Sequence, residues 1–301
     1  MNNNKQRVAI TGQGIISCLG LNREAVTAAL AAGRSGIELL PERQALGFQS
    51  ALSGVIHGFD PGRYLDRKKR KSMPEFAIWA WAAVEQALEQ AGISPETLHG
   101  DTETGLIFGN DSSAVSAVEQ VEALRAAGET RSIGSGHIFR LLNSTITLNL
   151  STILGLRGQV WTVSSACASG AMAIGQGAEL IASGRQQRML CGGAQEISWQ
   201  SMCSFDTLAA FSRREEEPAG ASRPFDMGRD GLVPSGGAAA VFLENYAAAE
   251  QRGAKILGEV LGYGAANDGH HIVLPSGDGL ERAMRQAISK AGLAPADIEL
   301  V

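Results

Sequence analysis

The chain alternates short apolar runs with stretches in which apolar residues recur at helical spacing. The runs are rich in valine, isoleucine and leucine and are bounded by glycine or polar residues, which is typical of buried strands. Six such runs predict strands, at residues 8–11, 105–109, 160–163, 188–193, 238–243 and 256–263. Strands that alternate with helices favour an α/β protein whose strands are largely parallel and covered by helices.

Helical spacing predicts four helices, three of them between these runs. Asn22 can cap a helix that buries Val26, Ala29 and Leu30 and ends at Gly33. Residues 73–91 give a stronger pattern, and a small-residue helix is expected from the run at 160–163 to about residue 184. The segment 212–230 is charged and carries two prolines, so we expect a surface loop there.

The last segment, residues 279–301, begins with an amphipathic helix over 279–291. Leu280, Met284, Ala287 and Ile288 lie on one face of this helix, and Gly292 can end it. Residues 295–301 then resemble a turn that leads into a strand. Because an unpaired apolar strand is an unusual end for a domain, we expect the chain to be truncated.

Composition restricts the class of protein. The 301 residues are 44% apolar and 19% charged, which is ordinary for a globular protein, and the net charge of −5 does not favour a nucleic-acid partner. We find no apolar run that could span a bilayer and no signal peptide before the first strand. A cytoplasmic protein is therefore expected.

The four cysteines lack the close spacing of zinc ligands, so we expect no metal and no disulfide. Cys191 lies inside an apolar run and is expected in the core, and Cys18 and Cys203 are interpreted as structural. A turn with Gly12 and Gly14 imitates the start of a dinucleotide fingerprint. Ser17 replaces its third glycine and no ribose-binding acid follows, so we expect a tight turn and no cofactor.

Cys167 has a different setting, because it lies where a strand gives way to a helix among small residues. The start of a helix carries free N–H groups and a partial positive charge, which favour a thiolate, and the amide of Cys167 could help to bind an oxyanion. A nucleophile on such a turn is open to substrate. The alternative is a small buried hydrophobic residue, as most free cysteines are.

The sequence around Cys167 (VSSACASG, residues 163–170) resembles the nucleophile motif of β-ketoacyl-[acyl carrier protein] synthases. Further segments resemble that family in the same order and cover nearly the whole chain. They are 8–17 (VAITGQGIIS), 33–37 (GRSGI), 191–196 (CGGAQE), 222–226 (SRPFD), 229–233 (RDGLV), 262–264 (GYG), 267–269 (NDG) and 275–277 (PSG). Any one of these matches is weak, but jointly they are specific.

The resemblance implies the layered α/β fold of the thiolase-like superfamily, built from two similar halves. Residues 1–250 would form the half that carries the nucleophile, and residues 251–301 would begin the second, incomplete half. It implies an acyltransferase of fatty acid or polyketide biosynthesis. An acyl group passes to Cys167 and then condenses with malonyl-[acyl carrier protein] as carbon dioxide is lost, without cofactor or metal.

The resemblance also implies substrate-binding residues. Gly109 matches a pocket-floor position, where a small side chain would leave room for an acyl chain, and Phe205 matches a residue that lines the acyl pocket. His271 matches a histidine near the site in some members, and a solvated loop histidine is the alternative. The family's two catalytic histidines, its active-site lysine and its glycine-rich oxyanion turn would lie beyond Val301. We therefore expect the isolated chain not to condense substrates.

A basic run stands out in an acidic protein: Arg67, Lys68, Lys69, Arg70 and Lys71. Such a run is usually a solvated face. In the family the equivalent segment meets the acidic acyl carrier protein, and Arg125 would lie in the same region. Opposite charges would speed the encounter and make it depend on salt.

Three other functions remain open. The first is a noncatalytic partner subunit like the chain-length factors, which usually lack the cysteine. The second is a dimerisation fragment, because in the family the strand before the cysteine, here 159–163, pairs across a homodimer or heterodimer. The third, a dinucleotide-binding oxidoreductase, would require NAD(P) binding. The sequence does not decide acyl chain length or distinguish the fatty acid, polyketide and aryl polyene pathways.

Overall fold

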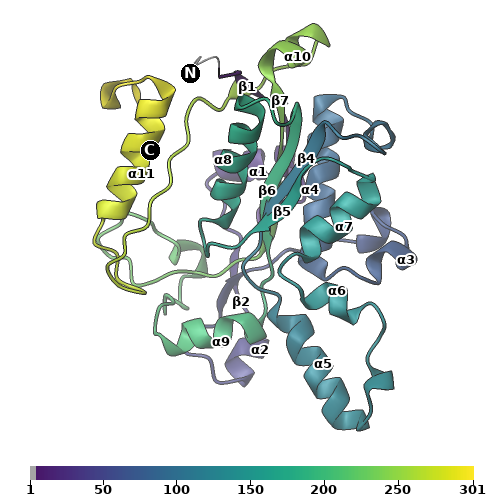
Figure 1. Cartoon of the computed structure of the whole chain (residues 1–301). Coiled ribbons are helices and arrows are strands. Elements are labelled where there is room, and N and C mark those ends of the chain that lie inside the picture. Colours follow the sequence, from purple (N-terminus) through teal and green to yellow (C-terminus); the bar gives the residue numbers. More distant parts are fainter. Residues whose placement is uncertain (1–4) are drawn as a thin grey trace.

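The computed structural model describes residues 5–301, and a six-stranded sheet with helices on both faces forms its centre (Figure 1). A separate two-stranded ribbon pairs β2 (Ile37–Leu39) with β3 (Leu52–Gly54). The strands of the main sheet, in spatial order, are β5 (Val160–Val163), β4 (Thr104–Gly109), β6 (Arg188–Gln195), β7 (Gly237–Asn245), β1 (Val8–Ile16) and β8 (Gly258–Glu259).

The sheet is mixed, so the prediction of largely parallel pairing was wrong for three of its five strand pairings. Strands β5, β4 and β6 pair in parallel, whereas β7 is antiparallel to both β6 and β1, and β8 is antiparallel to β1. The chain leaves β6 and enters β7 at the same edge of the sheet. A strand that starts where its neighbour ends must run in the opposite direction.

The helices include the four that the periodicity predicts, within a few residues. The longer ones are α1 (Arg23–Ala31), α4 (Glu75–Ala91), α5 (Ala114–Ala127), α7 (Thr145–Leu154), α8 (Ser169–Ala182), α9 (Trp199–Thr207) and α11 (Asp278–Ala291). The shorter ones are α2 (Pro41–Ala45), α3 (Arg67–Arg70), α6 (His137–Leu141) and α10 (Tyr246–Gln251). Helices α5, α7 and α9 were not predicted, because the apolar residues of α5 do not gather on one face and those of α7 and α9 are mixed with serine and threonine.

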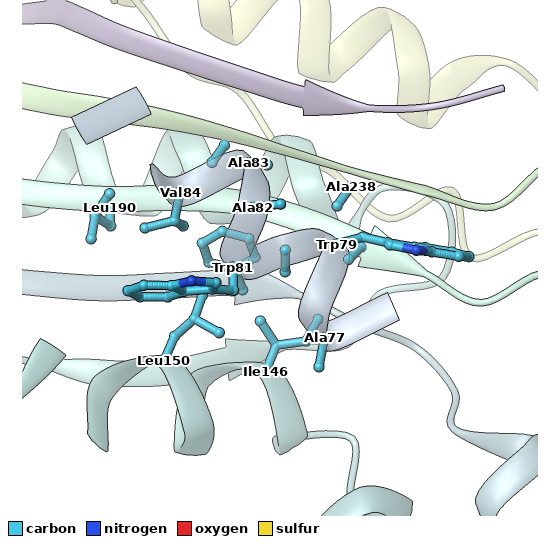
Figure 2. Packing of buried hydrophobic residues seen from close by; sticks show 14 of the residues in the cluster. Ala77, Trp79, Trp81, Ala82, Ala83, Val84, Ile146, Leu150, Leu190 and Ala238 are labelled. Atoms are coloured by element: carbon cyan, nitrogen blue, oxygen red, sulfur yellow. The ribbon is translucent and has the colours of Figure 1, made fainter. Parts of the chain in front are cut away.

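One face of the sheet is covered by α4 and α7. Figure 2 shows α4, with Trp81, between the sheet, which contributes Leu190 and Ala238, and α7, which contributes Ile146 and Leu150. All five of these side chains are buried. Because α4 is apolar on nearly every side, it is enclosed rather than half exposed.

The other face is covered by α8. Leu106 and Phe108 of β4 face the α4 cluster, whereas Ile107 between them belongs to the cluster beneath α8. This alternation follows from the two-residue repeat of a strand. Cys191 of β6 is fully buried in the α8 cluster, which confirms its place in the core.

Gly12 and Gly14 do not form the expected tight turn, because both continue strand β1 through a register shift between Ile10 and Gly12. A Cβ atom on Gly12 would lie 1.9 Å from the carbonyl oxygen of Ala87, and one on Gly14 would lie 2.0 Å from that of Ala83. These glycines therefore let the backbone of α4 rest directly on β1.

Three smaller predictions were wrong. Leu30 is 64% exposed although it follows the helical pattern of α1, because the sheet side of this nine-residue helix is already covered by Val26 and Ala29. The strand expected over 256–263 is reduced to β8, since only Ala9 and Ile10 of β1 pair with it. Residues 298–301 form no strand, because no neighbouring strand lies beside them in the described part of the chain.

Candidate active site

Cys167 lies on the elbow, which we define as residues 164–168, between the end of β5 and the start of α8. Its side chain is a free thiol and is exposed to solvent. Helix α8 begins two residues later, and its N-cap, Ala168, makes no side-chain hydrogen bond to the first turn. The positive end of the α8 dipole is therefore directed toward the elbow.

The backbone of the elbow adopts a strained conformation just before the cysteine. Ala166 has a φ of 46°, in the left-handed region that costs a residue with a Cβ atom about 1–2 kcal/mol. This bend turns the chain sharply from β5 into α8, so Cys167 projects outward instead of into the sheet. Sharp strand-to-helix turns present nucleophiles in the same way in other enzymes.

Ser169, the first residue of α8, fastens the elbow from the helix side. Its Oγ atom accepts a hydrogen bond from the amide of Ser165 at 2.7 Å and donates one to the carbonyl oxygen of Ala166 at 2.6 Å. The amides of Ala168 and Ser169 donate to the carbonyl oxygens of Ser165 and Ala166. The elbow is thus a compact hydrogen-bonded turn.

The loop after β4 supports the elbow from the sheet side. Asp111 accepts through Oδ1 a hydrogen bond from the hydroxyl of Ser164 at 2.9 Å and one from the amide of Ala166 at 3.2 Å. Asp111 was not among the residues predicted from the sequence. A polar pair directly after a buried strand was the available signal, because β4 and β5 are parallel neighbours and end at the same edge.

Three glycines allow α8 to start close to the sheet. A Cβ atom on Gly109, the last residue of β4, would lie 2.4 Å from the carbonyl carbon of Ser169. A Cβ atom on Gly193 of β6 would lie 3.1 Å from the Cα atom of Gly170. The first turn of α8 therefore packs against bare backbone, which brings Cys167 to the edge where β4, β5 and β6 end.

This packing gives a reason for glycine at position 109 that differs from the expected one. Gly109 was predicted to form a pocket floor. In the structure, the space beside its Cα atom is filled by the backbone of α8. The lack of a side chain thus permits close helix packing. A contact of Gly109 with substrate stays a prediction.

Phe205 and His271 lie on separate elements. Among residues 5–301, the His271 side chain makes no hydrogen bond to the elbow. Phe205 lies on α9, is 45% exposed and stacks on Phe211 with 6.3 Å between ring centroids. His271 lies in an exposed loop, where its Nδ1 atom accepts hydrogen bonds from the amides of Val273 and Leu274, each at 3.2 Å. Their roles toward substrate stay predictions.

The other cysteines differ from Cys167 in exposure or setting. Burial raises the pKa of the Cys191 thiol well above its usual range, so this thiol is unreactive in the folded protein. Cys18 is half-buried. Cys203 is exposed on α9, but it lies within a helix, where its sulfur is 3.5 Å from the carbonyl oxygen of Gln200.

A buried carboxylate joins β6 to α5 at the same edge of the sheet. Glu196 follows β6, and its Oε1 atom accepts a hydrogen bond at 2.7 Å from the amide of Ala114, the first residue of α5. Burial raises the pKa of Glu196, and the backbone amides of Ala114 and Val115 oppose that shift. The negative charge at the start of α5 also complements the helix dipole.

The basic residues lie on α3, which is labelled in Figure 1, and just beyond it. Arg67, Lys68, Lys69 and Lys71 are exposed, and Arg70 is half-buried. The ammonium group of Lys71 donates a hydrogen bond to the hydroxyl of Ser135 at 2.8 Å, in the connection after α5. Arg125 is exposed in the last turn of α5, so the chain segment that follows this helix links the two basic regions.

Across residues 5–301, no three histidine, cysteine, aspartate or glutamate side chains are grouped so that they could hold a metal ion. Within the same range, no helix is both long enough and apolar enough to cross a membrane.

Sequence comparison relates the chain to one family over nearly its whole length. The N-terminal domain of β-ketoacyl synthases matches residues 5–249, and the C-terminal domain of that family matches residues 257–301. The 3-oxoacyl-[acyl-carrier-protein] synthase 1 of Haemophilus influenzae is 40% identical over 286 residues. That alignment covers 94% of this chain and 70% of the relative.

Solved structures give the same relationship. A β-ketoacyl synthase from Burkholderia phymatum superimposes with a TM-score of 0.89 at 37% identity, over 96% of this chain and 71% of that one. A type II polyketide ketosynthase, solved with its acyl-carrier protein, matches with a TM-score of 0.85 at 27% identity, over 98% of this chain and 72% of that one. The predicted thiolase-like α/β fold is confirmed, and the chain belongs to the β-ketoacyl synthase family.

Proposed function

We propose that the chain is a β-ketoacyl-[acyl carrier protein] synthase that uses Cys167 as its nucleophile. The observation that carries this proposal is the exposed thiol of Cys167 on a strained turn between β5 and α8. Family membership and the names of the relatives support it. The division of the chain near residue 250 belongs to the same proposal.

The first half-reaction transfers an acyl group to the enzyme. The Cys167 sulfur attacks the carbonyl carbon of an acyl thioester, and the thiol of the donor leaves with the proton that the Cys167 thiol gives up. The product is an acyl thioester on Cys167, which divides one difficult step into two. In this proposal the amide of Cys167 donates a hydrogen bond to the developing oxyanion.

The second half-reaction, which we expect the isolated chain not to complete by itself, begins when a malonyl thioester loses carbon dioxide and leaves a carbanion. This carbanion attacks the carbonyl carbon of the acyl group on Cys167. A carbon–carbon bond forms as the carbon–sulfur bond breaks, and the Cys167 thiolate is released. The substrates are carrier-bound acyl and malonyl groups of fatty acid or polyketide synthesis, in the cytoplasm.

The first half-reaction provides the direct test. The chain is incubated with acyl-carrier thioester, and each cysteine-containing peptide is examined by mass spectrometry for acylation. We expect acylation at Cys167, its loss in Cys167→Ala, and wild-type acylation in Cys203→Ala, which removes the other well-exposed thiol. Acylation at Cys203 in place of Cys167, or no acylation at all, would refute the proposal and favour a noncatalytic partner.

We propose that the basic segment, residues 67–71, docks the carrier protein. Its exposed charges stand on a short helix capped by Asp66, whose Oδ1 atom accepts a hydrogen bond from the amide of Lys69 at 2.9 Å. This cap holds the helix while the side chains of Arg67, Lys68 and Lys69 stay exposed to solvent. A relative solved with its acyl-carrier protein supports the choice of partner.

Charge reversal tests this docking surface. Replacing Lys68, Lys69 and Lys71 by glutamate should weaken carrier binding by at least about threefold at low salt, since each exposed pair contributes about 0.2–1 kcal/mol. The matched control reverses three exposed charges elsewhere, at Arg34, Arg185 and Lys255. Equal losses in both triple variants would indicate an effect of net charge alone and would contradict a local docking surface.

We also propose that the chain forms a dimer through β5. This strand is at the edge of the sheet, with β4 as its only neighbour among the described strands. Trp161 of β5 is half-buried, and its indole N–H donates a hydrogen bond to the Gln176 side chain at 3.0 Å, which orders this edge. Sedimentation equilibrium at micromolar concentration should give a dimer, and a monomer there would exclude this interface.

A further inference from the structure

The Asp111 carboxylate reaches the elbow from a different strand. It accepts two hydrogen bonds through one oxygen, from the Ser164 hydroxyl at 2.9 Å and from the Ala166 amide at 3.2 Å. These donors belong to the two residues that stand three and one positions before Cys167. A charged acceptor forms stronger hydrogen bonds than a neutral one.

A hydrogen-bond acceptor for the Ala166 amide helps to hold this residue in place, because its backbone is strained. A φ of 46° is unfavourable for alanine and persists only where the surroundings impose it. Ser169 holds the Ala166 carbonyl oxygen on the helix side, and Asp111 holds the Ala166 amide on the sheet side. Together they fix both hydrogen-bonding groups of the strained residue.

The loop that carries Asp111 is itself anchored, so the carboxylate has a fixed position. The Asn143 side-chain amide donates a hydrogen bond to the Asp111 carbonyl oxygen at 3.1 Å. The preceding residue, Asn110, donates from its backbone amide to the Val163 carbonyl oxygen at 3.1 Å and from its side chain to the Asn143 carbonyl oxygen at 2.8 Å. These bonds tie the loop after β4 to the end of β5.

We propose that Asp111 is a positioning residue for the nucleophile, which it serves by holding Ala166 in the left-handed conformation that directs Cys167 outward. This inference rests on the proposed role of Cys167. Asp111 forms no bond to substrate in this account. Its effect is on the rate at which the thiol reaches the acyl carbonyl carbon, and not on how tightly the acyl donor is bound.

The test measures acylation of Cys167 by acyl-carrier thioester over a range of donor concentrations. Loss of a hydrogen bond to a charged group predicts that Asp111→Ala lowers the maximal acylation rate about tenfold. The half-saturating donor concentration should stay within about twofold of wild type, since the docking surface is untouched. Asp111→Asn keeps an acceptor oxygen and should retain the rate within about threefold.

Asp101 provides a matched control at the opposite end of β4. Its carboxylate also accepts from a hydroxyl and a backbone amide, those of Thr104 at 2.5 Å and Glu103 at 2.8 Å. Asp101→Ala should lower the melting temperature but leave the acylation rate of the folded protein unchanged. A tenfold loss in this variant as well would reduce the Asp111 effect to general destabilisation and overturn the proposal.

A double-mutant cycle tests the mechanism itself. Glycine adopts positive φ without a steric cost, so Ala166→Gly removes the strain that Asp111 is proposed to hold. The rate loss caused by Asp111→Ala should therefore fall from about tenfold to about threefold or less in the Ala166→Gly background. An undiminished tenfold loss there would show that Asp111 acts in another way.

The outcomes separate this inference from the proposed function. If the wild type does not acylate Cys167, the proposed function fails and this inference falls with it. If the wild type acylates Cys167 and Asp111→Ala does so equally fast, only this inference is overturned. Should Asp111→Ala not fold, Ser164→Ala removes one of the two donors, and a loss of about twofold to threefold is expected. A wild-type rate in that variant would overturn the inference.

Discussion

Glu85 is a carboxylate on the enclosed helix α4 and borders a cavity of about 450 Å³. Tyr64, Trp81 and His99 also line this cavity, which lies on the face of the sheet opposite α8. Burial raises the pKa of Glu85 from its ordinary 4.5 to about 7, and the indole N–H of Trp81 and the ammonium of Lys69 oppose the shift. The folded protein therefore holds a proton here that the unfolded chain releases.

The sign of the resulting pH dependence follows from this difference. Between pH 4.5 and pH 7 the folded state binds more protons than the unfolded state, so the free energy of unfolding falls as pH rises through that window. The full difference would correspond to about 3 kcal/mol, and screening of this half-buried group by solvent reduces it to about 1–2 kcal/mol. Well above pH 7, Glu85 is ionised in both states, so its effect on the free energy of unfolding no longer changes with pH.

Glu85→Gln tests this reasoning, because glutamine resembles the protonated carboxyl and does not titrate. Urea unfolding of both proteins at pH 5 and pH 8 gives the free energy of unfolding by linear extrapolation. The variant should gain about 1–2 kcal/mol over wild type at pH 8 and distinctly less at pH 5. Glu122→Gln, exposed on α5 and not among the groups that shift the pKa of Glu85, is the matched control. An equal difference at both pH values would refute the argument.

Two further predictions concern packing and thiol reactivity. Gly109→Ala should lower the free energy of unfolding by about 1–3 kcal/mol, since its Cβ atom would meet the backbone of α8. Gly134→Ala is the control, because a Cβ atom there meets nothing within 4 Å, and its free energy of unfolding should stay within about 0.5 kcal/mol of wild type. An equal loss of stability in the two variants would contradict the packing argument. In native protein, iodoacetamide should modify Cys167 and Cys203 but not Cys191, which should react only after unfolding. Early labelling of Cys191 would show that the core opens locally.

Local patterns in the sequence were sufficient to predict several helices and strands and the family of this protein. The helix over 75–91 and its end at Gly92 follow from apolar spacing and from a glycine that adopts positive φ. The strands around Ile107 and Cys191 follow from runs that are apolar on both faces, which indicates burial before any partner is known. The motif around Cys167, together with segments in family order, indicated the β-ketoacyl synthase family and its fold.

The tertiary structure decided the features that depend on distant segments. Strand β7 is antiparallel because of the edge at which the chain re-enters the sheet, and periodicity within a strand carries no direction. Gly12 has the same local signature in a turn as in a strand, and only the approach of Ala87 from α4 explains it. Asp111 is ordinary in sequence, and its importance depends on β5 ending beside it, 53 residues away from Ser164 along the chain. Local chemistry determines which elements form, whereas contacts between segments far apart in sequence determine what each side chain meets.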